Sequence, residues 1–157
     1  MTEINGKTRE IFETLCKAFE ILKLKYEKSE EELSVKCTVH GEDLIMNLDV
    51  SVYGDRSLVI LTSKLPFVVR EDKRVDMAIA VSGINYVLAD GCFDFDITDG
   101  NIYFRMTNSF IDSEISEDVF VYLLLISSRI IDEYNDKFLM LSKGVLSVEQ
   151  LLDFITD

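Results

Sequence analysis

Few residues of this sequence have the type and spacing that catalysis or metal binding requires. His40 is the only histidine, and it precedes Gly41 in a stretch that reads as a hairpin turn. A catalytic triad or a histidine-based metal site would have to use His40, and no nucleophile elbow accompanies it. We therefore expect His40 to be an exposed turn residue without a catalytic role.

The three cysteines, Cys16, Cys37 and Cys92, are widely and irregularly spaced. They form no Cys-x-x-Cys pair, so neither a zinc site nor a redox motif is expected. Cys37 falls on a predicted core face and Cys16 borders another, and both are expected to be buried, inert thiols. Cys92 could be more reactive if it is exposed near a hairpin. An odd, irregular set of cysteines indicates no disulfide framework and favours a reducing cytoplasm.

Three carboxylates, Asp94, Asp96 and Asp99, resemble a site for a hard metal ion. However, the alternation of a strand places Asp94 and Asp96 on one face, while Asp99 belongs to a turn. The Gly and the bidentate Glu of a calcium loop are missing at the required offsets. We therefore predict no metal, no cofactor and no catalytic residue. A carboxylate pair for glycoside hydrolysis stays open, because nothing singles out a pair.

The composition is that of a folded but acidic protein. Of 157 residues, 48% are hydrophobic, which argues against disorder. The net charge of −13 repels phosphate backbones and anionic lipids, so neither nucleic acid nor membrane is an expected partner. The segment Met1–Lys7 lacks the pattern of a signal peptide, and the apolar run Val119–Ile126 is too short to cross a bilayer. The predicted location is the cytoplasm.

The hydrophobic periodicity predicts alternating helices and hairpins within a single domain, 1–157. The order is α-βββ-α-ββ-α-α, an α+β class in which helices pack on an antiparallel sheet. A three- and four-residue repeat indicates helices, and a two-residue repeat indicates strands. The helices are expected at 7–25, 72–89, 116–143 and 147 onward, and the strands at 33–39, 44–52, 58–64 and on either side of Asp99-Gly100 within 93–106.

Tight two-residue turns would fix the register of each hairpin. They place Val35 opposite Leu48, Val50 opposite Val59, and Phe93 opposite Met106, with all of these on one face. The same register pairs Asp94 with Arg105.

The opposite sheet face is too apolar to be wholly solvated, and the helix Val119–Ile131 is apolar on more than one side. Core packing alone and core packing plus an interface are about equally favoured for these residues. The candidate interface consists of Ile45, Leu58, Ile60, Phe120 and Leu124.

The element order and the stretch from Asn85 onward resemble the YbjN-like family of candidate bacterial sensory transduction regulators. The residues that carry the likeness are Asn85, the hairpin Gly91–Asp96 with Asp99–Arg105, and the segment Gly144–Gln150. The resemblance covers about half the chain, which lacks the Trp found in parts of that family. It implies a fold akin to the type III secretion chaperones, a homodimer and a non-enzymatic binding role. It implies no catalytic residues.

These observations favour a non-enzymatic protein-binding module, either chaperone-like or a regulatory adaptor. Its acidic surface would attract basic or amphipathic segments of a protein partner. The alternative is a small-ligand sensor or an unrecognised enzyme with a pocket between the helices and the sheet. A structural component of a larger assembly is a third possibility.

Overall fold

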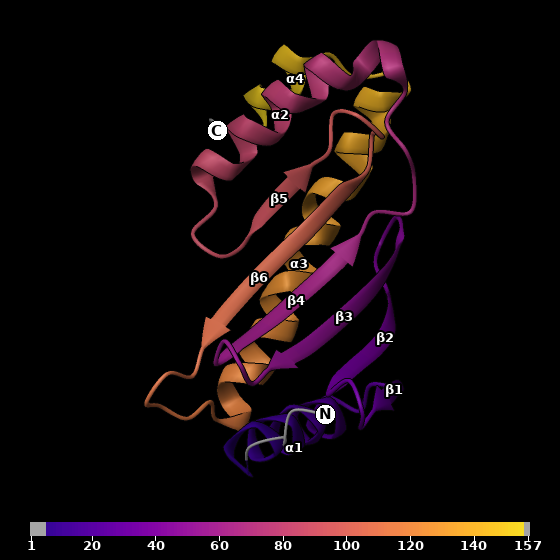
Figure 1. The fold of residues 1–157 in the computed structure, drawn as a ribbon. Helices are drawn as coiled ribbons and strands as arrows, with labels where there is room; N and C mark the ends of the chain where they lie inside the picture. The colour runs from indigo at the N-terminus through magenta and orange to yellow at the C-terminus, as the bar shows by residue number, and fades with distance from the viewer. Residues whose placement is uncertain (1–5, 156–157) are drawn as a thin grey trace.

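A computed structural model describes residues 6–155 and shows helices packed on an antiparallel sheet (Figure 1). The predicted single domain, 1–157, therefore extends beyond the described residues at both ends and stays a prediction. The predicted α+β class is confirmed. The elements in chain order are α1 (Gly6–Ile21), β1 (Tyr26–Ser29), β2 (Ser34–His40), β3 (Ile45–Tyr53), β4 (Leu58–Lys64), a 3-10 turn (Glu71–Lys73), α2 (Arg74–Val87), β5 (Cys92–Phe95), β6 (Ile102–Ser109), α3 (Glu117–Ser142) and α4 (Val148–Asp153).

The described strands form one six-stranded sheet in the order β1-β2-β3-β4-β6-β5. Strand β1 was not predicted, because its charged residues read as a solvated connector. An edge strand tolerates such charges. Glu27 and Lys28 are exposed here, while the ring of Tyr26 packs 5.2 Å from that of Phe19.

The core lies between one face of the sheet and the helices α1 and α3. Figure 1 shows α3 running behind the sheet, with α1 at one end and α2 and α4 at the other. The stripe predicted for the first helix is buried, and Phe12, Leu15 and Phe19 are at most 1% exposed. At the other end the ring of Phe93 makes edge contacts with Phe104, Tyr134 and Phe138 at centroid distances of 5.0 to 6.1 Å. The helices and the sheet therefore share a core that runs the length of α3.

The ends of the last two helices follow the sequence signals. The hydroxyl of Ser116 accepts a hydrogen bond from the amide of Val119, as expected of an N-cap. Ser147 and Gln150 form the predicted capping box of α4. By contrast, α1 ends at Ile21 and not at Lys25, because Lys23 has a left-handed φ of 54°.

All three predicted hairpin registers are wrong by two residues. Val35 pairs with Val50, Val50 also pairs with Leu61, and Phe93 pairs with Phe104. The loops have four residues where two were expected: 41–44, 54–57 and 97–100. A shift of two preserves the alternation of a strand, so the predicted core face is still correct.

Helix α2 is held against the β5–β6 hairpin by two polar side chains. The amide of Asn85 donates to the carbonyl of Phe93 and accepts from its N–H, both at 2.8 Å. The guanidinium of Arg74 donates to the carbonyls of Thr98 and Asp99 at 2.6 and 3.2 Å. Because backbone groups need partners when they leave a ladder, these contacts fix the position of the hairpin.

The β2–β3 loop is held against α3 in a similar way, and this contact requires glycine at position 41. The carboxylate of Asp132 accepts from the amide of Glu42 at 3.0 Å. A Cβ at Gly41 would lie 2.0 Å from Asp132 Oδ1 and 2.8 Å from the carbonyl oxygen of Leu44.

We therefore expect Gly41→Ala to lower the free energy of unfolding by about 1 kcal/mol, because the loop must move off the helix. Urea denaturation would measure the change. Gly6→Ala is the matched control, since a Cβ at Gly6 meets nothing within 4 Å. An unchanged denaturation midpoint in Gly41→Ala would show that the contact with Asp132 is dispensable.

No helix within residues 6–155 is long and apolar enough to span a membrane.

Candidate functional site

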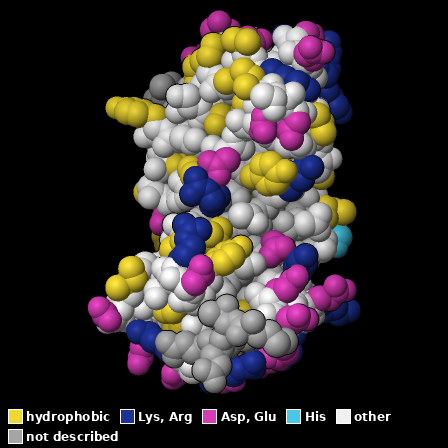
Figure 2. Space-filling view, viewed as in Figure 1, with side chains coloured by type: hydrophobic (Ala, Val, Ile, Leu, Met, Phe, Trp, Pro, Cys, Tyr) yellow, Lys and Arg dark blue, Asp and Glu magenta, His cyan; other side chains and the backbone are white. Residues whose placement is uncertain are grey.

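The sheet face opposite α1 and α3, hereafter the open face, carries the most extended uncovered surface of the sheet. Figure 2 shows hydrophobic, basic and acidic side chains interspersed over it. Its outward residues form rows across the strands, because directly paired residues point the same way. One row joins Lys36, Asp49, Thr62 and Arg105.

The charges of this row are paired within the face. Lys36 lies 3.5 Å from Asp49, and Arg105 contacts Asp94 at 2.6 Å. Asp94 raises the pKa of the Arg105 guanidinium through hydrogen bonding and charge. The predicted Asp94–Arg105 ion pair is present, although Asp94 stands directly opposite Tyr103. The centre of the open face is thus nearly neutral, in a chain whose net charge is −13.

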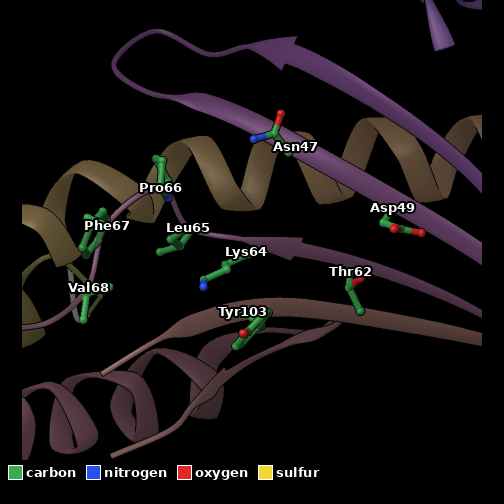
Figure 3. Close-up of a pocket in the computed structure, with 9 residues that line it drawn as sticks. All are labelled: Asn47, Asp49, Thr62, Lys64, Leu65, Pro66, Phe67, Val68 and Tyr103. Atoms are coloured by element: carbon green, nitrogen blue, oxygen red, sulfur yellow. The ribbon is translucent and has the colours of Figure 1, made fainter. Parts of the chain in front are cut away.

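A hollow of about 480 Å³ opens beside the middle of this row, at Asp49 and Thr62 (Figure 3). The structure brings together side chains from β3, β4, β6 and the segment that follows β4. Lys64 reaches over the Tyr103 ring, with Nζ 5.8 Å from the ring centroid. The lining consists of Asn47, Asp49, Thr62, Lys64, Leu65, Pro66, Phe67, Val68 and Tyr103. Lys64, Tyr103 and Asp49 supply an amine, a phenol and a carboxylate, and residues 65–68 form an apolar wall. Such a lining suits a polar peptide segment that carries an apolar side chain.

A second hollow of about 690 Å³ adjoins the first, since both are lined by Asn47 and Asp49. It extends across β2 to β1, where Lys25, Tyr26 and Glu27 form its far side. The two together make a shallow groove that crosses the strands. Sequence reasoning missed Lys64 and Tyr103. The alternation of each strand predicts that both side chains point outward. Their closeness depends on the pairing of β4 with β6, which the sequence did not show.

The predicted interface residues of the sheet lie on the open face but not together. Leu58 and Ile60 are half-buried at the β3–β4 end, opposite Tyr53 and Ser51. Ile45 is 47% exposed at the other end of β3, where it pairs with His40. The row of charges separates Ile45 from the other two, so these three residues do not form one patch.

Phe120 and Leu124 lie elsewhere. They are 1% and 2% exposed and face the core side of the sheet. Within this chain they are core residues and not part of an accessible surface, because the inner side of α3 packs on the sheet. The exposed apolar side chains of the same helix segment are Val119, Tyr122 and Leu125.

Within residues 6–155, the space between the sheet and the helices α1 and α3, where the alternative function would place a ligand, is packed with side chains. Where α1 and α3 meet the sheet, the described residues leave a void of about 10 Å³, lined by apolar side chains such as Leu15, Val59 and Phe120. That volume is at the lower limit for one water molecule. A ligand between the helices and the sheet would therefore need this core to open.

The polar residues singled out from sequence have structural roles here. His40 is the exposed last residue of β2. Asp96 accepts from the amide of Thr98, and Asp99 accepts from the amide of Asn101, both at 2.8 Å within the β5–β6 loop. Hydrogen bonds from the hydroxyl and then from the amide of Thr98 lower the pKa of Asp96. Among residues 6–155, no three His, Cys, Asp or Glu side chains are grouped so that they could hold a metal ion.

The cysteines differ in accessibility. Cys16 and Cys37 are buried, and burial raises the pKa of Cys37 to about 11. Cys92 is half-buried, with Sγ 3.5 Å from Arg105 and 3.7 Å from Asp94. Burial, followed by the Asp94 charge, raises the pKa of Cys92 above its ordinary value.

We expect a disulfide reagent to modify one thiol of the native protein, that of Cys92, and to do so slowly at pH 8. The thiolate is the reactive form, so the rate should rise about tenfold per pH unit while the pH stays below the raised pKa. Absorbance of the released thiol measures the rate. Cys92→Ser should abolish the native reaction, and modification of Cys37 without denaturant would contradict the burial described above.

The comparisons with known proteins show a likeness in fold and none in sequence. No protein-family profile and no curated protein matches the sequence. Among solved structures, YbjN from E. coli, described as a candidate transcription regulator, superposes with a TM-score of 0.57. The superposition covers 80% of this chain and 92% of that one. The fold is YbjN-like. At 12% identity the likeness to YbjN concerns the fold alone.

Proposed function

We propose that this protein is a non-enzymatic binding module, a regulatory adaptor or chaperone-like domain that takes a segment of a protein partner on its open face. The observation that carries the proposal is the uncovered groove across β2, β3, β4 and β6. It combines paired charges, hydrogen-bonding side chains and an apolar wall. Such a mixture is typical of non-obligate protein interfaces. The description of YbjN as a candidate regulator supports the same reading.

We further propose that the module acts in the cytoplasm as a homodimer, as the resemblance to the YbjN-like family implies. Sedimentation at high protein concentration tests the dimer. A strict monomer would contradict it without affecting the binding proposal.

Affinity capture with matched variants tests the binding function. Tyr103→Asp places a charge in the wall of the groove, whereas Val145→Asp changes an apolar residue that is 69% exposed in the α3–α4 connection. We expect protein partners captured by the wild type to be lost with Tyr103→Asp and retained with Val145→Asp. Equal capture by both variants would exclude the Tyr103 end of the groove as the binding surface.

A small-ligand sensor is the second candidate, and one observation favours it. The first hollow has the volume of a ligand site, and its polar groups Asn47, Asp49, Lys64 and Tyr103 converge. The ligand would then bind on the open face and not in the interior. A metabolite that raises the melting temperature of the wild type but not of Lys64→Ala would support this function.

A further inference from the structure

Strand β6 is longer than the edge strand that covers it. Residues 92–95 of β5 pair with residues 102–105 of β6, and β5 begins at Cys92, opposite Arg105. Strand β6 continues to Ser109, and its other side pairs with β4 along its whole length. In Figure 1 the lower half of β6 accordingly has no strand on its outer side.

The hydrogen bonds at the two ends of the β4–β6 ladder show which backbone groups face this gap. The amide of Leu65 donates to the carbonyl of Ile102, and the amide of Phe110 donates to that of Ser57, both at 2.9 Å. In an antiparallel pair alternate residues bond to the same neighbour, so the even-numbered residues of β6 bond to β4. The N–H and C=O groups of Thr107 and Ser109 therefore point to an edge that none of the described strands occupies.

Apolar side chains flank this edge on the helix side of the sheet. On α3, Val119 and Tyr122 are 37% and 50% exposed, and half-buried Ile126 follows one turn later. The hydroxyl of Tyr122 donates to Asp90 at 2.7 Å. Because Asp90 lies in the segment leading into β5, this contact places that face of α3 on the β5 side of the sheet.

On the open face the edge presents the side chains of Thr107 and Ser109, and the half-buried Ile60 and Leu58 lie beyond them on β4. A strand added to β6 would therefore meet apolar groups of α3 on one face and hydroxyl groups on the other. Side chains that alternate along an added strand can use both.

The charges around the edge are acidic. Asp90 lies at one end, and Asp112 and Glu114 follow β6 at the other. The nearby Arg105 is already paired with Asp94. A second copy of this chain would bring another net charge of −13 to the same place, whereas a basic segment would be attracted.

We propose that the free edge of β6 at Thr107–Ser109 binds an extended, basic segment of a partner protein by β-strand addition. In this mode main-chain hydrogen bonds supply affinity, and the flanking side chains supply selectivity. The inference rests on the proposed binding function and specifies how the partner chain is held. It makes the β5-side edge of the sheet, together with the adjoining exposed side chains of α3, the first point of contact.

The experiment uses the full-length protein and a defined probe, a ten-residue peptide of alternating lysine and valine with blocked ends. Backbone amide exchange and chemical shifts are followed by NMR. In the free protein we expect fast exchange for Thr107 and Ser109 and slow exchange for Met106 and Asn108. On addition of the peptide, the amides of Thr107 and Ser109 should become protected. A peptide N-methylated at every residue should give no protection, because neither of its edges keeps the N–H donors that a ladder needs.

Two variants make the test specific. Thr107→Pro removes an outward N–H that takes no part in the β4 ladder, so the fold should persist, and it should weaken peptide binding about tenfold. Thr107→Ala keeps the backbone donor and should bind within about twofold of the wild type. Thermal unfolding of both variants checks that the fold is intact.

Three results would overturn the inference in distinguishable ways. If the peptide shifts Asn47, Lys64 and Tyr103 but not Thr107, the open face binds the segment and the edge does not. If the peptide affects neither region at millimolar concentration, both the inference and the proposed function lose their support. If the wild type is a dimer that Thr107→Pro dissociates, a second copy occupies the edge and a basic partner segment does not.

Discussion

We expect Asn85→Ala to lower the free energy of unfolding by about 2 to 4 kcal/mol relative to the wild type, and the melting temperature by about 5 to 15 °C. The amide of Asn85 completes two hydrogen bonds of the Phe93 backbone at 2.8 Å each. Removing it leaves a donor and an acceptor without partners beside a core aromatic residue. Thermal and urea unfolding, followed by circular dichroism, measure the loss.

Two further substitutions separate the hydrogen bonds from helix propensity. Ser82→Ala changes an exposed residue of the same helix and should leave the stability nearly unchanged. Asn85→Asp keeps the acceptor for the Phe93 amide but loses the donor when it is ionised. Its deficit relative to the wild type should therefore shrink as the pH falls and the carboxyl regains a proton. If the three variants were equally stable, α2 would be held to β5 by apolar packing alone.

The helices and the core face of the sheet could be predicted because each depends on local periodicity. The caps at Ser116 and Ser147 are local as well, and both were correct. Strand β1 was missed because pairing at a sheet edge, and not apolar content, makes it a strand.

The hairpin registers could not be predicted because distant groups stabilise each loop. Asp132 on α3 holds the first loop, and Arg74 on α2 holds the third. In the second, the carbonyl of Ser57 accepts from the amide of Phe110 beyond β6. Each contact joins residues far apart in the sequence. A Gly-containing turn motif favours two-residue loops, and tertiary contacts override that preference in all three.

The candidate interface shows the same limit. Alternation placed Ile45, Leu58 and Ile60 on the open face, and the structure places them there. Alternation could not show that Ile45 is separated from Leu58 and Ile60, because the separation depends on which residues of neighbouring strands are paired. For Phe120 and Leu124, an apolar helix surface could not distinguish a side facing the sheet from a side facing solvent. The free edge of β6 depends on the unequal lengths of two neighbouring strands, which no local pattern encodes.

Asn135→Leu is expected to raise the free energy of unfolding by about 2 kcal/mol, a stabilising change in the core. Asn135 lies on the inner side of α3 and is 0% exposed. Among the described residues, neither its Nδ2 nor its Oδ1 has a hydrogen-bond partner. Burying an amide without partners costs free energy that a leucine avoids, because leucine has the same branched shape with somewhat larger methyl groups in place of the amide O and N. Urea denaturation measures the gain, with Asn135→Ala as the control that removes the amide but leaves a cavity and should gain less or lose stability. A destabilised Asn135→Leu would contradict this prediction, because it would mean either that the amide has a polar partner in solution or that the packed core has no room for the larger methyl groups.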